Sequence, residues 1–128
     1  MSISKIQIEA ILKLSAPKRY SHFIKKVVGW KKAWGLYDDG WAMSETNEGE
    51  AVLPLWPEKE YAQLCVSGEW SSYQPKAIRI DDIFEEVIPT LKENDILPGI
   101  FYTLDGGSIN ATLDELENDL KQELSKYT

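Results

Sequence analysis

Histidine and cysteine are almost absent from this sequence, because its 128 residues include only one of each. A single cysteine cannot form an internal disulfide bond, which favours a reducing compartment, so we expect a cytoplasmic protein. A structural zinc site takes about four cysteine or histidine ligands, and the sequence therefore predicts no such metal site. It shows no signal peptide and no apolar run near the roughly 20 residues of a membrane-spanning helix, so we expect no membrane segment.

Common catalytic and nucleotide-binding motifs are also missing, including the phosphate-cradling glycine loops and the nucleophile elbow. On a predicted helix, His22 points away from the apolar stripe among Lys18, Lys25 and Lys26, with no carboxylate on that helix surface to orient it. We interpret His22 as a solvated side chain and Cys65, on an apolar helical face, as part of the core. The sequence thus indicates no catalytic residue and no cofactor, although carboxylates from distant elements could still converge on a cleft.

Charge is distributed unevenly along the chain. Residues 1–32 carry eight lysines and arginines against one glutamate, a net charge of +7, whereas residues 33–128 carry a net charge of −14. The overall charge of −7 argues against nucleic-acid binding. Two interpretations of the asymmetry remain open: the basic helices lie against the acidic remainder, or they form a surface that meets an anionic partner.

The stretch from residue 34 to residue 64 predicts two hairpins followed by a helix. Asp39-Gly40 is typical of a two-residue type I′ turn, which places Trp34, Leu36, Trp41 and Met43 on one buried face. A second turn at 46–49 leads into a strand from about residue 50 to residue 55. A helix then follows Pro57.

That helix should bury Tyr61, Leu64 and Cys65 on one face and stop at Gly68. Four further helices are predicted from apolar periodicity and capping residues, and one more hairpin from turn residues. The other helices span about residues 3–14, 15–29, 81–91 (with Pro89 kinking or ending it) and 112–124, and the hairpin joins 99–103 to 108–111 across Asp105-Gly106-Gly107.

Two places are candidate partner-binding sites. In the first helix, Ile3, Ile6, Ala10, Ile11 and Leu14 form a stripe that we expect to face the core, whereas Ile8 and Leu12 point away from it. Either this helix is buried on both sides, or Ile8 and Leu12 form an exposed apolar strip for a partner or a second copy. In the loop after residue 68, Trp70 beside Tyr73 is either a binding anchor or a lid over a sheet edge.

Four segments together resemble a known family: Tyr20-Ser21-His22-Phe23, then W-G-L-Y-D-D-G-W-A, L-P-L-W-P-E-K-E-Y-A-Q-L-C and L-K-E-N-D-I-L-P-G-I-F. In order and spacing, about residues 19–120 are similar to the bacterial domain-of-unknown-function family 2750. The resemblance implies a small, single-domain, cytoplasmic bacterial protein. It implies no activity, ligand or catalytic residue.

We therefore predict one α+β domain over residues 1–128, with an antiparallel sheet built from hairpins and packed by about four to five helices. The function that we infer is protein binding without catalysis, cofactor or metal, with an unidentified protein or a second copy as the partner. The partner-binding candidates are Ile8, Leu12, Trp70 and Tyr73. The alternative is a small-molecule-binding or carboxylate-based hydrolytic domain that uses a cleft beside the tryptophan cluster.

Overall fold

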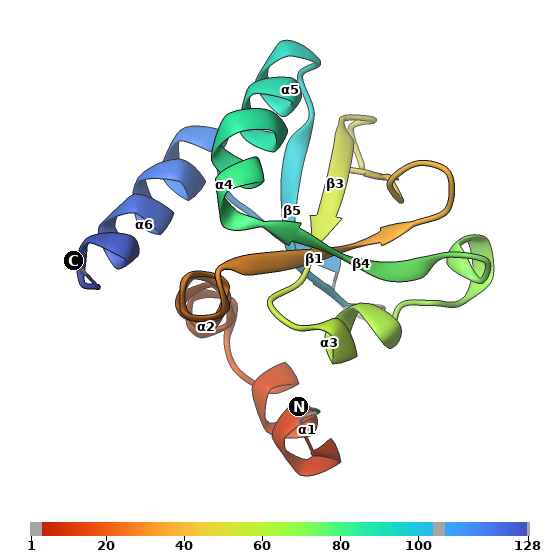
Figure 1. Cartoon of the computed structure of the whole chain (residues 1–128). Helices are drawn as coiled ribbons and strands as arrows, with labels where there is room; N and C mark the ends of the chain where they lie inside the picture. Colours follow the sequence, from red (N-terminus) through yellow and green to blue (C-terminus); the bar gives the residue numbers. More distant parts are fainter. Residues whose placement is uncertain (1–3, 104–106, 128) are drawn as a thin grey trace.

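The computed structural model describes residues 4–103 and 107–127, and it has the predicted α+β architecture (Figure 1). Helices α1 and α2 follow each other directly, α3 and α6 each lie between strands or follow the last one, and α4, the π-helical turn η2 and α5 run on as one helix. The helical elements are α1 (Lys5–Leu12), α2 (Ala16–Trp30), α3 (Lys59–Gln63), the 3₁₀ turn η1 (Gly68–Trp70), α4 (Ile80–Asp82), η2 (Ile83–Val87), α5 (Ile88–Glu93) and α6 (Leu113–Ser125). The strands are β1 (Lys32–Tyr37), β2 (Ser44–Glu45), β3 (Ala51–Leu55), β4 (Gln74–Arg79), β5 (Leu97–Thr103) and β6 (Gly107–Asn110).

The strands form a two-stranded sheet, β1-β4, and a four-stranded sheet, β2-β3-β5-β6. Most neighbours are antiparallel as predicted, but β3 and β5 are parallel, which hairpins alone cannot produce. The connection between them contains α3, β4 and the helix 80–93, and so brings the chain back in the same direction. Reciprocal backbone hydrogen bonds between Trp34 and Trp56, at 2.9 and 2.8 Å, join the two sheets.

The turn after β1 has the predicted left-handed residues but a different length. Asp39 and Gly40 both have positive φ, 55° and 154°, as an Asp-Gly turn allows. However, Tyr37 pairs with Trp41, so three residues rather than two form the loop. The predicted register is therefore wrong by one position.

This shift moves the side chains of residues 41–43, which follow the turn, to the opposite face, because side chains alternate along a strand. Ala42 lies in the core at 2% exposure, whereas Met43 is 40% exposed. Trp41, predicted to be in the core, is half-buried on the other face, where its ring crosses Gly35. A Cβ atom at Gly35 would lie 2.9 Å from that ring, so the glycine makes this arrangement possible.

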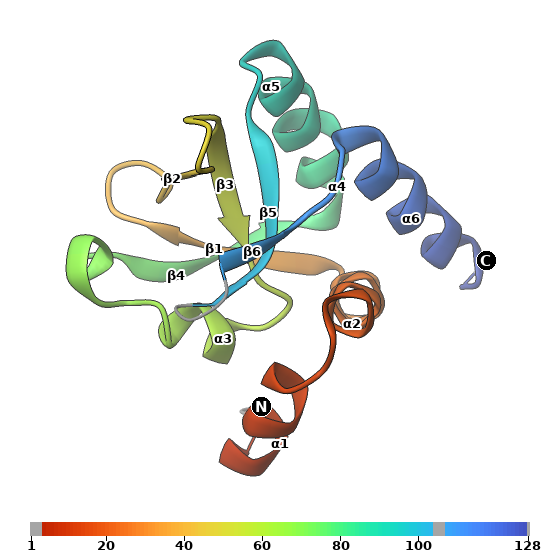
Figure 2. The same ribbon diagram turned by 180° about the vertical axis from the view of Figure 1, so that it is seen from behind.

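Helix α1 lies at the edge of the molecule and projects away from the sheets in both views (Figures 1 and 2). The predicted core stripe is wrong for Ile6, which is 79% exposed, and for Ala10, which is exposed, whereas Ile11 is partly buried against the core as predicted. Ile8 and Leu12, expected on the outer side, are also partly buried against the core. The prediction for Ile3 lies outside the described residues.

Two helix ends differ from the prediction. Helix α2 buries Phe23, Ile24, Val27 and Val28 as expected, but it passes through Gly29 and ends at Trp30. Lys31, with a φ of 62°, forms its left-handed cap. After Pro57, α3 buries Tyr61 and leaves Leu64 49% exposed, while Cys65 just beyond its end is buried. Gly68 does have a positive φ, but it begins η1 instead of ending α3.

The helix 80–93 does not end at Pro89, as an early stop would require. Proline lacks an N–H group and its ring collides with the carbonyl of the residue four positions earlier in an α-helix. The π-helical turn Ile83–Val87 directly precedes this proline and widens the helix there. The chain thus absorbs the proline by a local change in winding.

The C-terminal elements are as predicted. β5 and β6 pair as an antiparallel hairpin, although Asp105-Gly106 of its turn lies outside the described residues. Thr112 and Glu115 form the predicted capping box, with both hydrogen bonds at 3.0 Å. Leu116 and Leu120 of α6 are buried, and they close the core over α2 and the helix 80–93.

Candidate functional site

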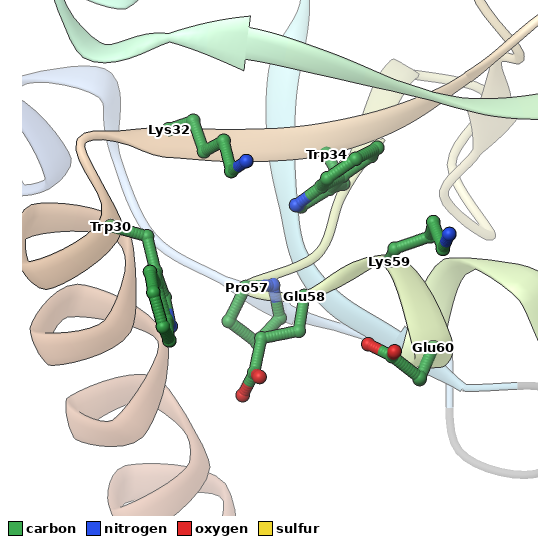
Figure 3. A pocket seen from close by; sticks show the side chains of 7 residues that line it. All are labelled: Trp30, Lys32, Trp34, Pro57, Glu58, Lys59 and Glu60. Carbon is green, nitrogen blue, oxygen red and sulfur yellow. The ribbon is translucent and has the colours of Figure 1, made fainter. Parts of the chain in front are cut away.

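A groove of about 320 Å³ lies where the end of α2, strand β1 and the segment entering α3 meet (Figure 3). Trp30 forms one wall, and Trp34 lies across the groove beneath β1. The remaining lining comes from one strand residue and the start of α3. The residues that line the groove are Trp30, Lys32, Trp34, Pro57, Glu58, Lys59 and Glu60.

The two tryptophans are held by different parts of the fold. Trp34 is fixed by its backbone bridge to Trp56, and the ammonium group of Lys32 lies 5.3 Å from the centre of its ring. Trp30 is the last residue of α2, so its side chain extends beyond the core that the rest of the helix covers. As a result, Trp30 is 54% exposed, which is unusual for so large an apolar side chain.

The floor of the groove carries opposite charges. Glu58 brings a carboxylate that Figure 3 shows on the side of Trp30, Glu60 brings a second one on α3, and Lys32 and Lys59 bring ammonium groups. Burial raises the pKa of Glu58, and Glu60 adds to this increase, whereas the positive charge of Lys26 opposes it. A cation placed beside Glu58 would therefore stabilise its ionised form.

His22 lies beside this groove and is not a solvated side chain, contrary to the prediction. Its side chain is only 17% exposed, and its Nε2 atom is 3.9 Å from an oxygen of Glu58, which is 12% exposed. Its ring packs against Tyr61 and Phe101, with centroids 6.4 and 6.1 Å away. Burial, and then Lys26, lower the pKa of His22, so the neutral imidazole is favoured.

The family comparison covers this site. A family model described as "Protein of unknown function (DUF2750)" matches residues 20–120. The chain belongs to this family. The match includes His22 and every residue that lines the groove, whereas helix α1 precedes it. A comparison with curated proteins finds no match.

The predicted partner-binding residues lie elsewhere. Trp70 is half-buried, with its ring centroid 6.4 Å from that of Trp56 and 5.2 Å from that of Tyr102. Tyr73 is also partly buried against the core. Trp70 thus packs on Trp56, which follows β3, and on Tyr102 of β5, two inner strands of the sheet rather than its edge, and its role as a binding anchor stays a prediction. The structure does not bring these residues together with Ile8 or Leu12 at the Trp30 groove.

Cys65 is buried, as predicted, and donates to the backbone oxygen of Tyr102 at 3.6 Å. Burial raises the pKa of its thiol to about 11. In residues 4–103 and 107–127, no group of three or more histidine, cysteine or acidic side chains is placed to hold a metal ion. Nor does any helix in these ranges have the length and apolar character needed to cross a membrane.

Proposed function

We propose that this protein is a protein-binding domain without catalytic activity, and that the groove beside Trp30 receives a segment of the partner. The observation that carries the proposal is the 54% exposure of Trp30 at the wall of a groove with a charged floor. Tryptophan is enriched among the residues that dominate binding energy at protein interfaces. Burying its free face would remove a large apolar area from water.

The composition of the groove favours a protein segment over a metabolite. Small-molecule sites are commonly enclosed, mostly apolar cavities of about 300–1,000 Å³. The present groove has a volume near the lower limit, and four of its seven lining residues are charged. An aromatic wall with a mixed-charge floor suits an apolar side chain that is flanked by polar and charged groups of a partner.

The proposal can be tested by placing a photo-crosslinking amino acid at position 30 in cells. The matched control is the same amino acid at Leu64, which caps the end of α3, is 49% exposed and does not line the groove. We expect one protein to be crosslinked from position 30 and not from position 64. That protein, once purified, should bind the Trp30→Ala variant at least about 30-fold more weakly than wild type, the loss of a hot-spot side chain.

The Leu64→Ala variant should bind the purified partner as wild type does. Because Trp30 is exposed, its replacement should change the free energy of unfolding by less than about 1 kcal/mol, which urea denaturation can verify. Equal crosslinking from both positions, no crosslinking from position 30, or unchanged affinity of Trp30→Ala would contradict the proposal.

One observation favours the alternative of a small-molecule-binding or hydrolytic domain. Glu58 lines the groove with a raised pKa, and the neutral form of His22 lies 3.9 Å from it. A carboxyl with a raised pKa can act as a general acid. For a hydrolase, Glu58→Gln should abolish turnover while Trp30→Ala mainly raises KM. For a protein-binding groove, Trp30→Ala should weaken partner binding more than Glu58→Gln does.

A further inference from the structure

The basic N-terminal part of the chain carries several lysines without a close ion pair among the described residues, although Lys26 acts electrostatically on Glu58 and Lys25 shares a groove with Asp119 and Glu123 of α6. We call residues 4–32, which comprise α1, α2 and the start of β1, the basic arm. In the described ranges, no lysine or arginine of this arm has a carboxylate within 4.0 Å. Among the described residues, the ion pairs formed by lysine and arginine lie in the rest of the chain: Arg79–Asp81, Lys92–Asp114, Lys92–Glu117, Lys121–Glu117 and Lys126–Glu123.

The outer face of α2 presents part of this charge to solvent. Lys18 and Lys25 are exposed and lie about 10 Å apart along the helix, since they are seven positions apart in the chain. Both line a groove of about 420 Å³ that runs along the start of α2, with Leu14, Pro17, Ser21 and His22. Helix α1 lies next to this surface in sequence and leaves Ile6 79% exposed.

An acidic surface lies on the helix 80–93. We call this helix the acidic helix because it carries Asp82, Glu85 and Glu86. The two glutamates are exposed. Among the described residues, none of the three carboxylates has a lysine or arginine within 4.0 Å. In both views α1 lies at one end of the molecule, whereas α4 and α5 lie toward the other (Figures 1 and 2). Helix α2, which carries Lys18 and Lys25, lies between them, so the exposed lysines of the arm and the exposed glutamates of the acidic helix are on separate elements (Figures 1 and 2).

We propose that a second copy of this chain binds to this surface, with the basic arm of each copy on the acidic helix of the other. An antiparallel pair with two-fold symmetry makes this contact twice and leaves neither arm free. The negative charge of −14 on residues 33–128 would repel a nucleic acid but attracts the arm of a second copy. This self-association goes beyond the proposed partner groove and does not depend on it.

Sedimentation or light scattering on the full chain at about 100 μM tests the proposal. Contacts between charges weaken as the Debye length falls from about 30 Å at about 10 mM salt to about 3 Å at about 1 M. We expect a dimer at the low salt concentration and a monomer at the high one. A monomer at both concentrations, or a dimer that is insensitive to salt, would overturn the proposal.

Charge reversal locates the contact. Lys18→Glu with Lys25→Glu should give a monomer at low salt. Lys59→Glu with Lys76→Glu makes the same change in net charge at exposed lysines outside the arm, and it should remain a dimer. Circular dichroism and urea denaturation would verify that both variants fold. A dimer in the first variant, or a monomer in the second, would contradict the proposed interface.

Mixing two variants gives the most specific result. Glu85→Lys with Glu86→Lys should also be monomeric alone. When mixed with Lys18→Glu, Lys25→Glu, it should form a heterodimer, because one contact is then reversed in sign and the other is unchanged. No heterodimer at low salt would refute the pairing of the arm with the acidic helix. Failure of partner binding by Trp30→Ala would not affect this outcome, so the two proposals can fail separately.

Discussion

Gly99 lies in β5 where the sheet leaves no room for a side chain, so Gly99→Ala should destabilise the protein. A Cβ atom added there would lie 2.5 Å from Cγ1 of Val52 and 3.2 Å from Oγ of Ser108. The first distance is far below an ordinary carbon–carbon contact of about 3.5–4.0 Å. Either β3 or β6 must move away, and both are paired with β5.

The expected magnitude follows from two opposing contributions. Overpacking a well-packed core costs about 1–3 kcal/mol. Replacing glycine by alanine also lowers the conformational entropy of the unfolded chain, which stabilises the folded protein by about 0.4–1 kcal/mol. The net loss in the free energy of unfolding should therefore be about 1–2 kcal/mol. Urea denaturation followed by tryptophan fluorescence measures it.

A double-mutant cycle with Val52→Ala tests the cause. Val52→Ala alone should cost roughly 2 kcal/mol, because it removes two buried methyl groups. In the double variant the new methyl at position 99 occupies the vacated space, so the combined loss should be smaller than the sum by at least about 1 kcal/mol. If Gly99→Ala is neutral, or if the two losses add, the steric argument is wrong.

Gly29 provides the matched glycine control. It lies inside α2, and an added Cβ atom would meet nothing within 4 Å. Gly29→Ala should therefore stabilise the protein by about 0.5–1 kcal/mol, the usual benefit in a helix interior. A loss of stability would instead indicate that the helix ends at Gly29, as the sequence alone suggested.

Three further predictions concern a cap, the thiol and the histidine. Thr112→Ala should lower the free energy of unfolding by about 1 kcal/mol, whereas Ser4→Ala, in the equivalent capping box of α1, should leave the global transition unchanged because α1 buries no residue fully. Native Cys65, with its pKa raised to about 11, should react with a thiol reagent near pH 8 at least about 100-fold more slowly than in urea. The pKa of His22 is lowered, so its contribution to stability is present above its ordinary value of 6.5 and is lost as the pH falls; wild type should lose more stability than His22→Gln between about pH 7 and about pH 5. Equal losses in these two proteins would mean that His22 titrates alike in the folded and unfolded states.

The elements that could be predicted from the sequence are those fixed by nearby residues. The stripe of α2, the capping box at Thr112 and the pairing of β5 with β6 all depend on residues within a few positions of one another. The register after Asp39-Gly40 could not be decided in this way, since an Asp-Gly turn fits loops of two or three residues. The ring of Trp41 selects the longer loop by crossing Gly35, and that contact exists only once the strand is placed.

The candidate site escaped prediction for a related reason. Trp30 lies three positions after Val27, at the spacing of the apolar face of α2, and this periodicity suggests a buried residue. Only the position of the sheet shows that the last turn of α2 extends beyond the core. His22 appeared to lack a carboxylate because Glu58, which comes from α3, is 36 positions away in the chain. A search restricted to one helix surface cannot detect such a pair. Burial of the imidazole depends on Phe101 and is equally non-local.

Helix α2 links the two proposals, and its geometry keeps them independent. At about 100° per residue, Trp30 lies roughly 120–140° around the helix axis from Lys18 and Lys25. One side of the helix end therefore forms a wall of the partner groove, while the outer face offers its charge to a second copy. Lys18 and Lys25 do not line the groove at Trp30, although Lys32 of the basic arm does, so a dimer formed through Lys18 and Lys25 would leave that groove accessible. The fold thus allows a dimer in which each copy still presents its own partner site.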